Sequence, residues 1–473
     1  MYPDSETGHE SPHNYGPSGA SREPLSNDQV HPEESVIAGK EERGTSGKLL
    51  RFLLTGGLIR KAILFFLAGI LAFGAYKYFK HPSLDKLVVG SDMEGYYQYL
   101  PWFFLHDWQD FRQLPWAKPY GEGTSLSVFT CGAALLQIPF FLAAHGVTLL
   151  TGGTPTGYGA FYFLSVFLAA LFYATLGMVF LGKALRRWFD PVSSLVATLL
   201  IFYGTNLFYY TIMMPGMSHV YSFAMVAAVL LMTPRFYEKP GVGRALLLAL
   251  PLSVAVLIRP TTAIVLLFVA LYGVHSIRQV QERVLFFVRH WQLLLLMAGV
   301  ALLVWVPQMA YWHFVTGKWV VWSYQSEGFS FWKNPQVITV LFGKRGGWFT
   351  YTPLMLATLV TLFYMAWRRI LSAPAIMVTL LSILYAVSSW WAPTFSASAG
   401  YRALIEFLPL MAVPLAFLVS RVRSLPAGWL LTFVKVVTVI LILYNIQFSF
   451  KYDATVWWDW PWSYKTMLRL FTF

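Results

Sequence analysis

Long apolar runs separated by short polar segments occupy most of this chain. Each run is near the length at which a helix, rising 1.5 Å per residue, crosses the roughly 30 Å hydrocarbon core of a bilayer. The pattern therefore predicts an all-α polytopic membrane protein with about 11 transmembrane helices. These runs cover residues 62–79, 159–182, 192–212, 219–233, 244–258, 260–275, 291–313, 351–367, 373–391, 403–420 and 428–449.

One further run, residues 131–150, is interrupted by Pro139 and carries Gln137 and His145. The positions of the basic residues decide how we interpret it. If this run does not cross, most Lys and Arg of the short loops fall on one side, as expected for cytoplasmic loops. We therefore predict that it lies in or near the outer interface. Residues 80–157 then form one large first external loop with juxtamembrane helices.

The two ends of the chain differ from the apolar middle. Residues 1–48 are rich in Ser, Pro, Gly and Glu without apolar periodicity, which predicts a disordered segment. Arg60 and Lys61 precede the first run, so the amino terminus is predicted to be cytoplasmic. The transmembrane domain then covers residues 49–450. Residues 451–473 form an aromatic tail on the external side.

Composition narrows the possible functions. Apolar residues make up 57% of the chain and charged residues 12%, which excludes an ordinary soluble globule. The net charge of +13 is spread through loops between apolar runs, so we reject a nucleic-acid partner. Cys131 is the single cysteine, so no intrachain disulfide forms. No Cys or His spacing indicates a metal site, although a requirement for a divalent metal stays open.

The first candidate site follows the first predicted span. Asp92 and Glu94 lie there beside an aromatic stretch typical of the membrane interface. A carboxylate in such a place is suited to accept a proton from a hydroxyl group. An alternative, compatible role is helix capping by Ser91 or Asp92. Tyr96 and Tyr97 either stack on a sugar ring or anchor the segment at the interface.

The second candidate site is LFGKRGGWFTYTPL, residues 341–354, in which Lys344 and Arg345 precede a predicted helix start. Thr352 as the N-cap and Pro353 as the first helical residue would place the positive end of the helix dipole at the outer surface. Basic side chains, flexible glycines and a helix amino terminus together favour a phosphate. The alternative is that the two cations bind lipid headgroups.

The third candidate site combines residues at the outer ends of three spans. Arg402 and Glu406 are four residues apart and can face each other on one side of a helix. Ionisable residues at membrane depth are functional candidates, with a purely structural ion pair as the alternative. Arg259, between two short spans, must meet a polar partner. His219 is a further candidate, although a satisfied interfacial histidine is the commoner case.

These segments, in this order and spacing, resemble the GT-C superfamily of integral membrane glycosyltransferases. The closest resemblance is to bacterial members related to protein O-mannosyltransferases and lipid A aminoarabinose transferases. SDMEGYYQYLPWF resembles the acidic motif of that family, LFGKRGGWFTYTPLM its basic motif before a late span, and SWWAPTFSASAGYRALIEFLPL its arginine-containing helix. The resemblance covers most of residues 60–425.

The resemblance implies an inverting sugar transfer from a polyprenyl-phosphate donor to a hydroxyl acceptor on a glycan, lipid or protein. Asp92, with Glu94 nearby, would act as the base. Lys344, Arg345, Arg402 and Arg259 would bind the donor phosphate, while Tyr96, Tyr97, His219 and Glu406 would contact substrate. The site would face the periplasm from the bacterial inner membrane. The alternatives are a transporter or flippase for a lipid-linked or anionic solute, for which we find no internal repeat, and a non-catalytic scaffold.

Overall fold

A computed structural model describes residues 92–395 and 398–452 of the chain. Over these residues it confirms the predicted all-α class, because the only strands are β1 (Lys118–Pro119) and β2 (Ser125–Leu126), which pair antiparallel. The predicted disordered segment 1–48, the predicted first span 62–79 and the tail beyond residue 452 lie outside the described residues.

Six helices in the described part of the chain are long and apolar enough to cross a membrane. One of them joins a short 3₁₀ turn, η4, to a regular helix. The six are α6 (Gly132–Leu150), α7 (Ala160–Leu185), α10 (His219–Glu238), α14 (Trp291–Thr316), η4 (Arg402–Phe407) with α19 (Leu408–Arg423), and α20 (Trp429–Lys451).

Five apolar helices are shorter. They are α8 (Pro191–Tyr203), α11 (Val242–Ile258), η3 (Pro260–Ile264) with α12 (Val265–Leu271), α17 (Leu354–Trp367) and α18 (Ala373–Ser388). Together with the long helices they account for every predicted span after residue 158, so the apolar runs predicted helix positions well.

The prediction of one helix over residues 192–212 is wrong, because this run forms two helices. α8 ends at Tyr203 and α9 (Leu207–Ile212) begins after a break at Gly204 to Asn206. The Nδ2 of Asn445 donates hydrogen bonds to the carbonyl oxygens of Tyr203 and Thr205, at 2.8 and 2.7 Å. A side chain from α20 therefore satisfies the backbone groups that the break exposes, as apolar surroundings require.

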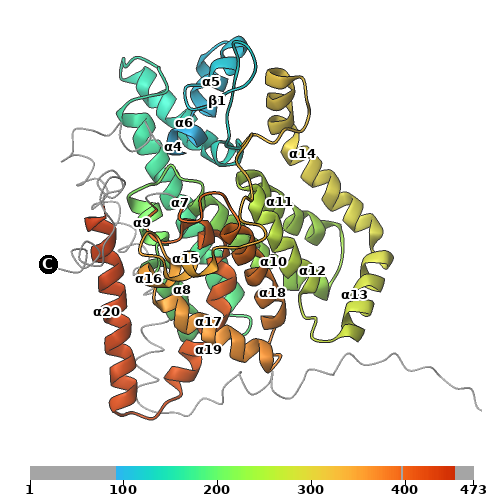
Figure 1. Ribbon diagram of the computed structural model, residues 1–473, viewed down its shortest axis with the longest axis vertical. Helices are drawn as coiled ribbons and strands as arrows, with labels where there is room; N and C mark the ends of the chain where they lie inside the picture. The colour runs from blue at the N-terminus through green and yellow to red at the C-terminus, as the bar shows by residue number, and fades with distance from the viewer. Residues whose placement is uncertain (1–91, 396–397, 453–473) are drawn as a thin grey trace, which may run out of the picture.

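The small elements before α6 gather at one end of the molecule, at the top of Figure 1. They are α4 (Asp92–Tyr97), α5 (Tyr99–Leu105), η2 (Trp108–Gln113) and the β1–β2 hairpin. α6 packs against both α4 and α5. Gly132, at the start of α6, lies against the backbone of Ile258, and Gly157, after its end, lies against Pro101 of α5. The start of α6 thus contacts the end of α11, and the segment after α6 contacts α5, whereas the place of α6 relative to a membrane stays a prediction.

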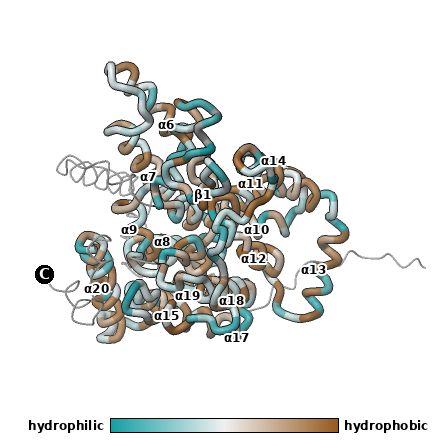
Figure 2. Tube along the Cα trace, turned by 45° about the horizontal axis from the view of Figure 1, so that its top comes forward, coloured by the Kyte–Doolittle hydropathy of each residue, from teal (hydrophilic) through white to brown (hydrophobic). Residues whose placement is uncertain are grey.

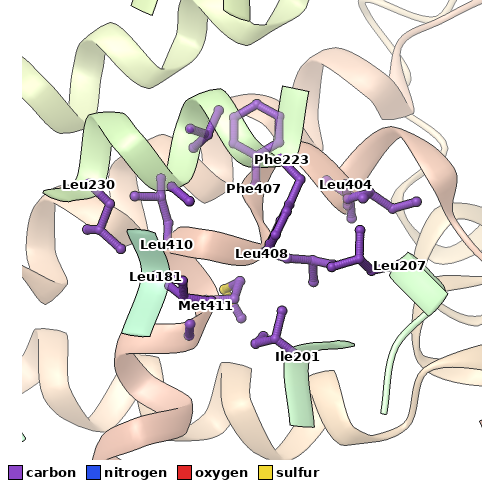
Figure 3. Close-up of a cluster of buried hydrophobic side chains, with 14 of the residues drawn as sticks. Leu181, Ile201, Leu207, Phe223, Leu230, Leu404, Phe407, Leu408, Leu410 and Met411 are labelled. Atoms are coloured by element: carbon purple, nitrogen blue, oxygen red, sulfur yellow. The ribbon is translucent and has the colours of Figure 1, made fainter. Parts of the chain in front are cut away.

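A buried apolar core lies between α7, α8, α9, α10, η4 and α19, and Figure 3 shows part of it. α10 packs against α7 and α11, while α19 packs against α8 and α17. The core therefore fixes the start of α10, which carries His219, and the short η4, which carries Arg402 and Glu406. The labelled core side chains are Leu181, Ile201, Leu207, Phe223, Leu230, Leu404, Phe407, Leu408, Leu410 and Met411.

Helices at the edges of the molecule expose apolar side chains. In both α14 and α20 only 6% of the most apolar stretch is buried, and the two helices flank the bundle in Figure 1. Figure 2 shows the hydrophobic residues along α14. An apolar surface of this kind suits contact with lipid. A helix that we did not predict, α13 (Ile277–Arg289), precedes α14 and has none of its residues buried.

Candidate functional site

Asp92 and Arg402 form the ion pair at the centre of the candidate site. Asp92 is the first residue described in α4, and Arg402 is the first residue of η4, 310 positions later. The Nη2 of Arg402 donates to Oδ2 of Asp92 at 2.8 Å, with 19% and 35% of the two side chains exposed. A carboxylate and a guanidinium therefore meet at a partly exposed position.

Glu406 does not pair with Arg402, which corrects the pairing considered from the sequence. Residues 402–407 form a 3₁₀ helix, in which residues three apart align and residues four apart do not. The carboxylate of Glu406, 1% exposed, instead lies 2.6 Å from Nε of Arg259 and 3.1 Å from Nδ1 of the fully buried His219. The Arg259 contact is an ion pair without hydrogen-bond alignment. Arg259 thus has the polar partner that its position demanded.

Packing brings α4 to the start of α10. Gly216, three residues before His219, lies so close to Met93 that an added Cβ would be 2.9 Å from the Cβ of Met93. On the next turn of α4, Tyr96 lies close to Ser218. Gly95 meets the ring of Phe129, whose centroid is 4.5 Å from that of Tyr96. The Asp92 and Glu406 ion pairs therefore belong to one packed region.

The basic turn that carries Lys344 and Arg345 lies against the segment that leads into Arg402. This turn joins α15 (Val337–Phe342) to α16 (Trp348–Tyr351). Gly346 has φ of +80° and an added Cβ would lie 3.4 Å from the carbonyl oxygens of Thr394 and Ser398. The hydroxyl of Tyr351 donates to the carbonyl oxygen of Lys344. The second and third candidate motifs are therefore adjacent in space.

The helix start predicted after this turn is displaced by one residue. α17 begins at Leu354 with Pro353 at the N-cap position, and Thr352 makes no capping hydrogen bond. The hydroxyl oxygen of Thr352 is buried without a hydrogen-bond partner among the described residues. The predicted cap is therefore wrong in detail.

Tyr324 is a site residue that the sequence did not reveal. Burial raises its pKa, with Tyr96 adding to this effect and the charge of Arg259 opposing it. These influences place its hydroxyl near the ion pairs. The loop that carries it is tied to the β1–β2 hairpin by an ion pair between Lys118 and Glu327. Nothing in the loop sequence distinguishes Tyr324 from its aromatic neighbours.

Two other predicted residues lie on a different side of α4. Tyr97 is fully buried and its hydroxyl donates to the carbonyl oxygen of Gly157 at 2.6 Å, as expected of a packing residue. Glu94 is 8% exposed and lies near Tyr158, where it adds to the effect of burial in raising the pKa of that phenol. Tyr96, in contrast, belongs to the region of the ion pairs.

The arrangement combines two guanidinium groups, two carboxylates and two neutral phenols. Burial raises the pKa of Tyr96 above its usual value, despite the opposing charge of Arg259, so its hydroxyl remains a hydrogen-bond donor at neutral pH. Oε2 of Glu406 and Nε2 of His219 are buried without hydrogen-bond partners among the described residues. No group of three or more His, Cys, Asp or Glu that could hold a metal occurs in the described ranges.

Comparison with known proteins gives one finding. No protein-family model matches the chain, and no curated protein matches it in sequence. A crystal structure of ArnT from Cupriavidus metallidurans bound to undecaprenyl phosphate aligns with 81% of this chain and 70% of the ArnT chain. The TM-score is 0.46 and the sequence identity is 14%.

Proposed function

We propose that this protein is a membrane glycosyltransferase that moves a sugar from a polyprenyl-phosphate donor to a hydroxyl acceptor on the outer face of the membrane. The observation that carries the proposal is the 2.8 Å pairing of Asp92 with Arg402, beside the buried Arg259–Glu406 pair. A base for a hydroxyl group and cations for a phosphate leaving group thereby occur together at one end of an apolar helix bundle.

In the proposed reaction, the carboxylate of Asp92 takes the proton of the acceptor hydroxyl. The acceptor oxygen attacks the anomeric carbon and forms the new glycosidic bond, while the bond from that carbon to the phosphate oxygen breaks. The electron pair of the broken bond leaves with polyprenyl phosphate, and the anomeric configuration inverts. Asp92 then returns its proton to water, so the chain is unchanged after each turnover.

Arg402 has two successive partners in this scheme. Without substrate it pairs with Asp92. When the donor binds, the phosphate takes over the guanidinium, because Arg matches phosphate oxygens in a bidentate geometry. The carboxylate is thereby released to accept a proton. Lys344 and Arg345, on the adjacent turn, add positive charge where negative charge develops on the leaving group.

Arg259 is the second cation that we assign to the phosphate, and Glu406 and His219 position it. Glu406 is too deeply buried to be the base, and its 2.6 Å contact fixes the guanidinium of Arg259. His219 and Glu406 are both buried, so they act on the phosphate through Arg259 rather than by touching it. Tyr96 and Tyr324 supply aromatic surface beside them.

The test is sugar transfer by purified protein in lipid, with radiolabelled polyprenyl-phosphate sugars and glycan, lipid or protein acceptors. We expect Asp92→Asn to lower the rate about 10² to 10⁴-fold, the contribution of a general base. Asp107→Asn, the same change at an exposed residue after α5, is the matched control and should retain the wild-type rate. Wild-type transfer by a folded Asp92→Asn protein would contradict the assignment of the base.

A further inference from the structure

A basic cavity lies at the end of the bundle opposite the candidate site. Its volume is about 410 Å³, and it opens between the end of α7, the end of α10 and the start of α11. The lining combines charged groups with apolar side chains. The lining residues are Arg187, Met232, Arg235, Glu238, Arg244 and Leu247.

The length of α10 separates this cavity from the candidate site. His219, beside Glu406, is the first residue of α10 and Glu238, in the cavity wall, is the last. Twenty helical residues span about 30 Å, which is about the thickness of the hydrocarbon core of a bilayer. With the bundle in a membrane, the cavity and the candidate site therefore lie at opposite interfaces, and a ligand in the cavity cannot take part in the transfer reaction.

The charge of the cavity is positive. Three arginines face one carboxylate in its lining, and that carboxylate, Glu238, pairs with Arg187. The Nη1 of Arg244 donates to the carbonyl oxygen of Arg235 at 2.5 Å, which places Arg244 beside the end of α10. Because Glu238 neutralises the charge of Arg187, the guanidinium groups of Arg235 and Arg244 remain to bind an anion.

An exposed apolar stripe on α11 continues from the cavity. Leu247 belongs to the cavity lining and is 56% exposed, and Leu250, one turn further along α11, is 53% exposed. Leu246 lies beside them and is also exposed. The cavity thus opens onto an exposed apolar surface that follows the length of α11. Binding of a small inorganic ion buries no apolar surface, whereas an acyl chain that packs on this stripe removes apolar surface from water.

We infer that this cavity binds the phosphate headgroup of an anionic membrane lipid, with an acyl chain of that lipid lying along Leu247 and Leu250 of α11. Basic pockets between membrane helices are suited to this kind of headgroup. The ion pair of Arg187 with Glu238 joins the ends of α7 and α10. The bound lipid would bridge these two ends and the start of α11. The site is separate from the proposed transferase activity and does not depend on it.

The experiment compares lipid retention by native mass spectrometry. Full-length protein is released from vesicles of phosphatidylcholine, with or without phosphatidylglycerol, and a parallel arm adds inorganic phosphate alone. The variants are Arg244→Gln, Arg235→Gln and both together. Arg278→Gln is the matched control, because this arginine lies on α13, in the lower part of Figure 1. Its side chain is 88% exposed and pairs with the exposed Glu282.

We expect wild-type protein and Arg278→Gln to retain phosphatidylglycerol in preference to phosphatidylcholine. Each cavity substitution should weaken retention about fivefold, the effect of one basic residue near an anionic lipid. Phosphatidylglycerol should also raise the melting temperature of the wild type but not of the double variant. Equal retention by wild type and double variant would overturn the proposal. Displacement of the lipid by inorganic phosphate would assign the cavity to a free anion instead.

Discussion

At the scale of single residues, Glu406 illustrates how a buried charge depends on its partners. Its carboxylate is 1% exposed and lies between Arg259 and His219. Removing one partner of a buried ion pair leaves the other charge uncompensated. The stability of this region therefore depends on both members of the pair being present, more than on the strength of their attraction.

We predict that Glu406→Gln lowers the free energy of unfolding by about 3 kcal/mol. Arg259→Gln should act similarly, and the double variant should be less destabilised than the sum of the two. Denaturant unfolding in detergent measures all three. Glu282→Gln, which breaks the exposed pair with Arg278, should cost about 0.5 kcal/mol or less. Additive effects of Glu406→Gln and Arg259→Gln would contradict the coupling.

The sequence identified most of the charged residues of the candidate site but assigned one pairing wrongly. Scarce charges next to apolar runs were enough to select Asp92, Arg259, Arg402 and Glu406. Their pairing depends on contacts between segments up to 310 residues apart, and on a 3₁₀ turn at residues 402–407 that turns Glu406 away from Arg402. Neither is encoded in a local spacing. Tyr324 was missed for the same reason, since its role depends on its neighbours in space.

At the scale of elements, the turn between α15 and α16 depends on Gly346. Its φ of +80° strains any residue with a Cβ, and the carbonyl oxygens of Thr394 and Ser398 leave little room for one. The same turn carries Lys344 and Arg345. A change at Gly346 therefore alters how these cations are presented to the segment that leads into Arg402.

We predict that Gly346→Ala costs about 1 kcal/mol of stability and also raises the KM for the polyprenyl-phosphate donor severalfold. Gly152→Ala is a matched control, because Gly152 has φ of +70° with no neighbouring atom within 4 Å. It should have the same strain cost and leave the KM unchanged. Donor titrations of both purified variants measure the difference. An equal KM for the two variants would show that the turn does not contact the donor.

Helix positions were predictable because an apolar run long enough to cross a bilayer has few other stable structures. The exceptions have identifiable causes. The break between α8 and α9 is stabilised by Asn445, about 240 residues away, and so leaves no local signal. We did not predict α13, because charged residues such as Arg278, Glu282 and Arg283 alternate with its apolar residues, so that it contains no long continuous apolar run.

At the scale of the whole molecule, the orientation of the chain in the membrane is the main prediction left to test. The distribution of Lys and Arg predicts that the candidate site lies outside and the basic cavity inside. It also predicts that α6 does not cross the membrane, although α6 is long and apolar enough to do so. Residues on either side of α6 distinguish the two arrangements.

We predict that single cysteines at Glu122 and Thr154, on either side of α6, both react with an impermeant maleimide added outside sealed cells. A cysteine at Lys239, beside the basic cavity, should react only after permeabilisation. All three residues are exposed, and the native Cys131 is buried, so background labelling is low. Labelling at Glu122 without labelling at Thr154 would show that α6 crosses.

The hydrogen bonds of Asn445 also set an order for biogenesis. Until α20 has been synthesised and inserted, the carbonyl oxygens of Tyr203 and Thr205 lack the hydrogen bonds that Asn445 donates at the break between α8 and α9. This break holds Asn206, whose Nδ2 donates to the carbonyl oxygen of Ala399, three residues before Arg402. We therefore expect the arrangement beside Arg402 to be complete only after α20, the last described helix, has been inserted.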